Sequence, residues 1–135
     1  MKVNTIQKEN LAEALTSLYF LMICADKYID TRELEMGRIM RSLENIDEKQ
    51  FFGRIDEYSN QDNRVVYNRC IDALERCDRQ DQVRCLAWMK VIAFSDGSMA
   101  TREWELYQNI CLNEINLDLN EVLEEQKKIR TVIGR

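Results

Sequence analysis

The segment ADKYIDTRELEM, residues 25–36, is the strongest indication of the fold, because the chain repeats its pattern as SDGSMATREWEL at residues 95–106. Aligned over residues 21–40 and 91–110, the two copies are identical at Asp26/Asp96, Thr31/Thr101, Arg32/Arg102, Glu33/Glu103 and Glu35/Glu105. Unrelated segments of this length would match at about one position, so the excess indicates an internal repeat. In each copy an apolar helix ends in an acidic turn, and a second helix follows.

The repeat extends into a third helix. The capping pair Asp47 and Gln50 aligns with Asp118 and Glu121 once one residue is inserted. The unit is therefore helix, acidic turn, helix, short turn, helix, and it occurs twice with a further helix between the copies. Two copies of one unit usually pack about an approximate twofold axis, so we expect an all-α bundle of about seven helices.

Apolar residues at helical spacing support each of these helices. With no proline and only four glycines, the chain offers no linker, so a single domain spanning residues 1–135 is expected. The expected helices are, in order, one ending near Asp26, one from a cap at Asp30 to about Asn45, one after a cap at Asp47, one carrying Val66 to Cys77, one carrying Val83 to Ala93, one carrying Trp104 to Cys111, and one after a cap at Asp118.

The composition is that of an acidic globular protein. The 135 residues carry a formal net charge of −5, which argues against nucleic-acid binding, because that depends on Lys and Arg neutralising phosphates. The apolar run Leu18 to Ala25 is shorter than a membrane span, and the charges before it, including Glu9 and Glu13, do not fit a signal peptide. We therefore expect a cytoplasmic protein with no membrane insertion.

The five cysteines are odd in number and form no Cys-x-x-Cys pair, which argues against a disulfide framework and against a zinc ribbon. We expect them to pack as small apolar residues. A redox pair formed by Cys70 and Cys77, which lie a heptad apart on one helical face, is the alternative. The five are Cys24, Cys70, Cys77, Cys85 and Cys111.

The doubled acidic turn resembles the pattern of the tellurite-resistance TerB-like family, in which a helix is followed by Asp-Gly, a β-branched or apolar residue and a Glu that opens the next helix. The resemblance covers nearly the whole chain. It implies a compact bundle of about seven helices and a binding or scaffold module of a stress system rather than an enzyme. The matching residues are Asp96, Gly97, Met99 and Glu103 in SDGSMATRE, and Asp26, Ile29, Asp30 and Glu33 in ADKYIDTRE.

Two positions depart from that pattern. Lys27 stands where glycine is usual, so a left-handed backbone there would cost on the order of 1 kcal/mol, or the turn must differ. Ala100 stands where the helix cap belongs, which leaves Thr101 as the candidate cap one residue later.

The resemblance also implies a metal site at the acidic positions, and the residues themselves allow one if the twofold axis passes near the turns. Carboxylate oxygens without histidine suit Mg²⁺, Mn²⁺ or Ca²⁺ better than zinc. The spacing is not that of an EF-hand, because Gly37 and Tyr107 occupy the twelfth positions where a bidentate Glu is required. The candidate ligands are Asp26, Glu33, Asp96 and Glu103.

Two accounts need no cation. Asp26 and Asp96 would accept backbone N–H groups within the turns, while Glu33 and Glu103 would complement the positive ends of the following helices. In the other account Arg32 and Arg102 pair with neighbouring carboxylates.

No catalytic residue is identified, because the chain has no histidine base, no glycine-rich phosphate loop and no nucleophile elbow. The aromatic residues, including Trp104, are expected to pack in the core, with Phe52 or Tyr58 as the alternative exposed anchor for a partner protein. We therefore expect a non-enzymatic binding or scaffold module whose partner is another protein. The rival interpretation is a purely structural interaction domain in which the acidic residues are helix caps.

Overall fold

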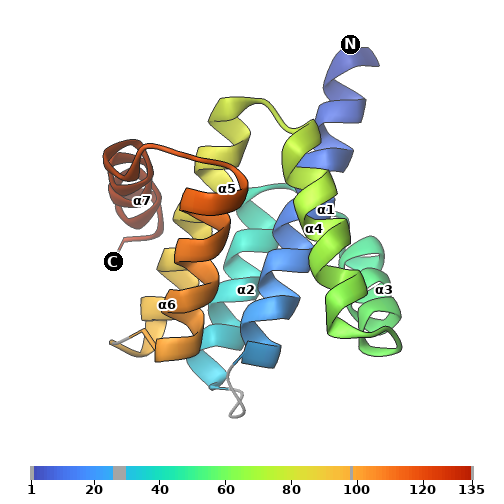
Figure 1. The fold of residues 1–135 in the computed structure, drawn as a ribbon, viewed down its shortest axis with the longest axis horizontal. Coiled ribbons are helices and arrows are strands. Elements are labelled where there is room, and N and C mark those ends of the chain that lie inside the picture. The colour runs from blue at the N-terminus through green and yellow to red at the C-terminus, as the bar shows by residue number, and fades with distance from the viewer. Residues whose placement is uncertain (1, 26–29, 98, 135) are drawn as a thin grey trace.

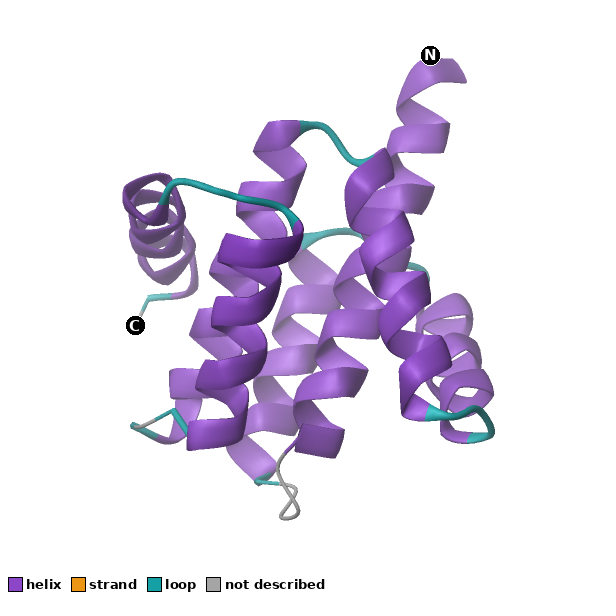
Figure 2. Cartoon of the chain, viewed as in Figure 1, coloured by secondary structure: helices purple, strands orange, loops and turns teal. Residues whose placement is uncertain are grey.

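The computed structural model describes residues 2–25, 30–97 and 99–134, and these form helices joined by short loops (Figure 2). The prediction of an all-α bundle of about seven helices is confirmed. In chain order the helices are α1 (Lys2–Ala25), α2 (Thr31–Leu43), α3 (Glu48–Ser59), α4 (Asn63–Arg76), α5 (Arg79–Ala93), the 3₁₀ turn η1 (Phe94–Asp96), α6 (Thr101–Gln108), which continues as the π-helical turn η2 (Asn109–Glu114), and α7 (Leu119–Ile133).

Aspartate is the N-cap residue of most of these helices. A side-chain oxygen of the residue before the helix accepts a backbone N–H of the first turn, which satisfies one of the donors that an α-helix leaves unpaired. Because this signal is local, the helix starts follow the sequence closely. The capping residues are Asp30 for α2, Asp47 for α3, Asp62 for α4, Asp78 for α5 and Asp118 for α7.

Helices α1 and α5 each pack against several other helices; Figure 1 shows α1 in the middle of the view and α5 behind α6. Helix α1 packs against α3 and α6, and α5 packs against α7 and α2, so these two contacts correspond between the three-helix units. The two units meet where α1 packs on α5. This exchange of second helices, α2 onto α5 and α6 onto α1, is the pattern that a twofold relation produces. Helix α4 lies on α1 and has no counterpart, as expected of the bridging helix.

Helix α5 carries the largest share of the core, because it is packed from both sides. Trp88 is fully buried, and its indole N–H donates to Glu44 Oε2 at 2.8 Å. Arg84 donates to the same oxygen at 2.7 Å and to Glu125 at 2.8 Å, so α2, α5 and α7 share one ion-pair network. The buried residues of α5 are Val83, Cys85, Leu86, Ala87, Trp88, Met89, Val91, Ile92 and Ala93.

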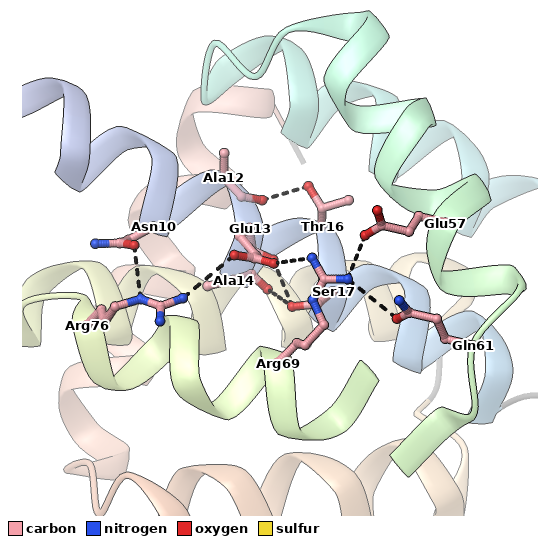
Figure 3. Close-up of polar contacts among 10 residues, drawn as sticks. All are labelled: Asn10, Ala12, Glu13, Ala14, Thr16, Ser17, Glu57, Gln61, Arg69 and Arg76. Carbon is pink, nitrogen blue, oxygen red and sulfur yellow. Dashed lines mark hydrogen bonds and ion pairs between the residues drawn. The ribbon is translucent and has the colours of Figure 1, made fainter. Parts of the chain in front are cut away.

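A second network ties α4 to α1 and α3 (Figure 3). The Arg69 guanidinium donates to Glu13 of α1 at 2.9 Å and to Glu57 of α3, and it lies 5.3 Å from the centroid of the Tyr58 ring. The hydrogen bond to Glu57 is the largest influence that raises the pKa of Arg69. Arg76 approaches the other oxygen of Glu13 at 3.7 Å. The bridging helix is thus held by charge as well as by apolar packing.

Two sequence expectations can be checked at α6. Trp104 was expected to be buried, but 39% of its surface is exposed, so this prediction is wrong. Its ring stacks on Tyr107 at a centroid distance of 5.7 Å, under the Lys90 ammonium, and Tyr107 takes the buried position instead. Thr101 is not a cap: α6 begins after Ala100, which makes no side-chain capping bond.

The four cysteines whose side chains are described are free and buried, as expected of small apolar residues. Cys70 and Cys77 form no disulfide. The four are Cys70, Cys77, Cys85 and Cys111. In the part of the chain that the structure describes, no helix is long and apolar enough to cross a membrane.

Candidate functional site

The four acidic residues predicted as metal ligands are only partly described. Asp26 lies outside the described residues, and the side chain of Asp96, the last residue of η1, does too. Glu33 and Glu103 are described and occupy the same position, the third residue of α2 and of α6. The predicted site is therefore described from the contacts of Glu33 and Glu103.

Both glutamates are buried, with exposed fractions of 3% and 2%. Glu33 accepts the backbone N–H of Asp30 at 3.4 Å, and Glu103 accepts that of Ala100 at 2.9 Å. Glu33 thus completes a capping box with Asp30, whereas Glu103 supplies only the glutamate half of that arrangement, because Ala100 has no side-chain acceptor. The capping interpretation of Glu33 and Glu103 is confirmed by these bonds.

Glu103 has one oxygen that the cap does not use. Its Oε2 is buried and has no hydrogen-bond partner among the residues that the structure describes. A buried carboxylate oxygen without a partner is costly, because it loses water and gains nothing in exchange. A bound cation would relieve this cost.

The second acidic turn has the backbone that the Asp-Gly pattern requires. Gly97 adopts φ 97°, a left-handed conformation that glycine enters without steric cost. Its counterpart Lys27 lies outside the described residues. Among the residues that are described, no three Asp, Glu, Cys or His side chains form a group that could hold a metal ion.

The arginines of the repeat differ. Arg32 pairs with Asp30 at 3.1 Å on an exposed surface, and its hydrogen bonds hold the Asp30 pKa below the ordinary value of 3.8. Arg102 makes no ion pair with any described carboxylate. Pairing by arginine is therefore confirmed for the first turn alone.

A groove on the first three-helix unit is lined mainly by apolar side chains. It measures about 330 Å³ and lies between the end of α1, α2 and α3. Aromatic rings form its floor: Tyr19 and Phe51 lie 5.7 Å apart, and Phe52 meets Phe51 edge-on at 5.4 Å. The lining residues are Tyr19, Phe20, Ile23, Leu34, Arg38, Phe51, Phe52 and Ile55.

The structure separates the two aromatic residues named as alternative anchors. Phe52 keeps 48% of its surface exposed at the groove, whereas Tyr58 is fully buried, and burial raises its pKa to about 12. An exposed phenylalanine beside an apolar groove is typical of a contact surface. Phe52 is the anchor candidate that fits.

Sequence reasoning missed two further groove residues, Leu34 and Arg38. They lie one turn apart on α2, off the buried stripe of Met36 and Met40. Leu34 is 36% exposed, and Arg38 makes no ion pair with a described residue. An apolar residue one helical turn before an arginine, both outside the buried stripe, is the signal that could have identified them.

No protein-family model, no curated protein and no solved structure matches this chain. The functional argument therefore depends on the geometry of its own residues.

Proposed function

We propose that this protein is a non-enzymatic binding module that docks a helix of a partner protein in the groove between α1, α2 and α3. The observation that carries the proposal is Phe52, a large apolar side chain left 48% exposed next to an apolar groove of about 330 Å³. Amphipathic helices bind such grooves with anchors at i, i+3 or i+4. A binding or scaffold role is also what the TerB-like resemblance implies.

The charge at the groove specifies the partner further. Among the described residues that line it, Arg38 is the one charged residue, in a protein whose formal net charge is −5. A carboxylate beside the apolar anchors of the partner would pair with this guanidinium. We therefore propose a partner helix with large apolar anchors and an adjacent Asp or Glu.

Selection from a displayed library of helical peptides of about 16 residues, long enough for four turns, tests the proposal. The selected peptides should carry apolar anchors on one face and an acidic residue. The Phe52→Ser substitution should lower their affinity for the protein about tenfold or more. Arg38→Glu should reverse the preference for acidic peptides.

Leu119→Ser on α7 is the matched control, because Leu119 is also 48% exposed but belongs to the second unit. Its peptide affinities should equal those of the wild type. Peptides that bind Phe52→Ser as tightly as the wild type would contradict the proposal.

A second candidate function is a hard-cation site at Asp26, Glu33, Asp96 and Glu103, for Mg²⁺, Mn²⁺ or Ca²⁺. The specific observation in its favour is the buried, unpartnered Oε2 of Glu103. The capping bonds of Glu33 and Glu103 favour the rival in which these residues only stabilise helices.

Thermal melts separate the two accounts. Each of the three ions should raise the melting temperature if the site binds it, since a ligand of the folded state stabilises by mass action, and Glu103→Gln should abolish the rise. If Glu103 is only a cap, no ion acts and Glu103→Gln costs about 0.3–1 kcal/mol. Glu105→Gln, an exposed change on the same helix, is the control.

A further inference from the structure

A second hollow lies between α2, the end of α5 with η1, and α7, away from the groove that contains Phe52. Its volume is about 150 Å³. Met36 and Val91 form buried apolar walls, and Phe94 stands at its edge with 38% of its surface exposed. The lining residues are Met36, Val91, Phe94, Ser95, Gln126, Arg130 and Ile133.

Gln126 is the unusual member of this lining. It keeps only 6% of its surface exposed, and its Oε1 is buried with no hydrogen-bond partner in the described part of the chain. An unsatisfied buried acceptor destabilises a fold, so such a group calls for a physical reason. In the repeat, Gln126 occupies the place that Ile55 holds in the first unit, where the side chain is apolar. The second unit has thus placed an amide in an otherwise apolar stripe.

Two further polar groups complete the lining. Arg130 lies one helical turn beyond Gln126 on α7, so both face the hollow, and it makes no ion pair with a described residue. The Ser95 hydroxyl donates to the Ile92 carbonyl at 2.7 Å, so its oxygen can act only as an acceptor toward the hollow. The hollow therefore presents two acceptors inside and one cation at its edge.

We propose that this hollow binds a small carboxylic acid that also carries a hydroxyl or amino group. The hydroxyl or amino group donates to Gln126 Oε1, the carboxylate pairs with Arg130, and the carbon chain packs on Met36 and Val91. A cavity of this size holds a ligand about as large as benzene. The site is separate from the groove at Phe52, and neither depends on the other.

The test uses three probes of matched shape: 2-hydroxyisovalerate, isovalerate and 3-methylbutane-1,2-diol. The second lacks the hydroxyl and the third lacks the carboxylate. Titration is followed through the Met36 methyl resonance up to roughly 20 mM, enough to saturate a millimolar site. The hydroxy acid should saturate and bind about tenfold more tightly than isovalerate, as one hydrogen bond to a buried group predicts. The diol should bind more weakly than the hydroxy acid by a similar factor.

Two variants assign the contacts, and circular dichroism confirms that each is folded. Gln126→Met keeps the length of the side chain but removes the acceptor, so the two acids should bind equally. Arg130→Met should weaken both acids and leave the diol unchanged. Lys127→Met, on the same helix but outside the hollow, should change nothing. The proposal is overturned if no probe gives a saturable shift, or if the preference for the hydroxy acid persists in Gln126→Met.

Discussion

The two three-helix units share their architecture but fill it with different side chains. In α1–α3, Tyr19 of the first helix covers Gly37 of the second, so closely that there is no room for a Cβ. In α5–α7 the corresponding residues are Met89 and Tyr107, so the ring comes from the second helix instead. The same pair of repeat positions thus holds a tyrosine on the first helix of one unit and on the second helix of the other.

The units also differ in what they leave open. Leu34 and Trp104 correspond in the repeat and are exposed to a similar degree, 36% and 39%. Leu34 and Phe20 both line the apolar groove of the first unit. Beside Trp104 stands Lys90, the counterpart of Phe20, whose ammonium lies 5.7 Å from the indole centroid. The second unit thus has a lysine where the first has an aromatic residue of the groove wall, and the docking groove that we propose lies in the first unit.

The largest expected change in stability comes from comparing alanine substitutions of Trp88 and Trp104, the two tryptophans of the second unit. Trp88→Ala should lower the free energy of unfolding by about 3–5 kcal/mol, because it opens a cavity and removes a donor from Glu44. Trp104→Ala should cost about 1 kcal/mol, since a half-exposed ring loses only its stacking. Urea denaturation measures both, and equal losses would show that Trp104 belongs to the core after all.

The next largest effect tests the close contact between Gly37 and Tyr19, which the second unit does not have at the same positions. Gly37→Ala would set a Cβ 2.7 Å from the Tyr19 hydroxyl oxygen and closer still to the ring, so about 1–3 kcal/mol of stability should be lost. Introducing Tyr19→Met as well, the residue that the second unit uses, should recover most of the loss in urea denaturation.

Gly53→Ala is the control for this glycine change. It also replaces a glycine inside a helix, but its new Cβ meets nothing within 4 Å. Stability should therefore rise by about 0.5–1 kcal/mol. A loss at Gly53, or no rescue by Tyr19→Met, would refute the packing argument.

The smallest expected changes in stability come from substitutions at the N-cap residues of α2 and α6. Asp30→Ala should cost about 1 kcal/mol, because Asp30 Oδ1 accepts the Arg32 N–H at 2.7 Å. Ala100→Ser should gain up to about 1 kcal/mol by supplying the cap that α6 lacks. Thermal melts at neutral pH compare the two variants, and an Ala100→Ser variant no more stable than the wild type would show that α6 is already satisfied.

The same pair predicts a difference in pH dependence. The side-chain and backbone hydrogen bonds of Arg32 hold the Asp30 pKa below 3.8, so the cap contributes stability above that pH and loses it as the pH falls further. The stability difference between wild type and Asp30→Ala should therefore close in acid. The gain from Ala100→Ser should not, because serine does not titrate in this range.

The helix boundaries could be predicted because their signals are local. An Asp accepts a backbone N–H two or three residues away, so the start of α3 at Glu48 follows from Asp47 and Gln50 alone. Trp104 could not be placed in this way. Both Trp104 and Tyr107 fit the apolar spacing of α6, and the packing of α5 decided that Tyr107 is buried.

The candidate sites were harder still, because three helices build each one. The sequence identified Glu33 and Glu103 as special, and both are buried capping residues. It could not show that Gln126 would face a hollow rather than solvent, since this depends on how α7 lies against α5 and η1. Side-chain pattern predicts which residues share a face of one helix, but not what another helix places opposite them.

The π-helical turn Asn109–Glu114 explains how the second unit carries one residue more than the first. An inserted residue in an α-helix rotates everything beyond it by about 100°, which would turn the next helix away from the core. The π-helical turn accommodates the inserted residue within residues 109–114. The backbone N–H of Ile115 accordingly donates to the Ile110 carbonyl, five residues earlier. Val122 and Ile129 therefore remain buried, as their counterparts Phe51 and Tyr58 are. This turn is a place where the gene could gain or lose a codon while the protein kept its core, so descendants of a duplicated unit can differ in length without differing in fold.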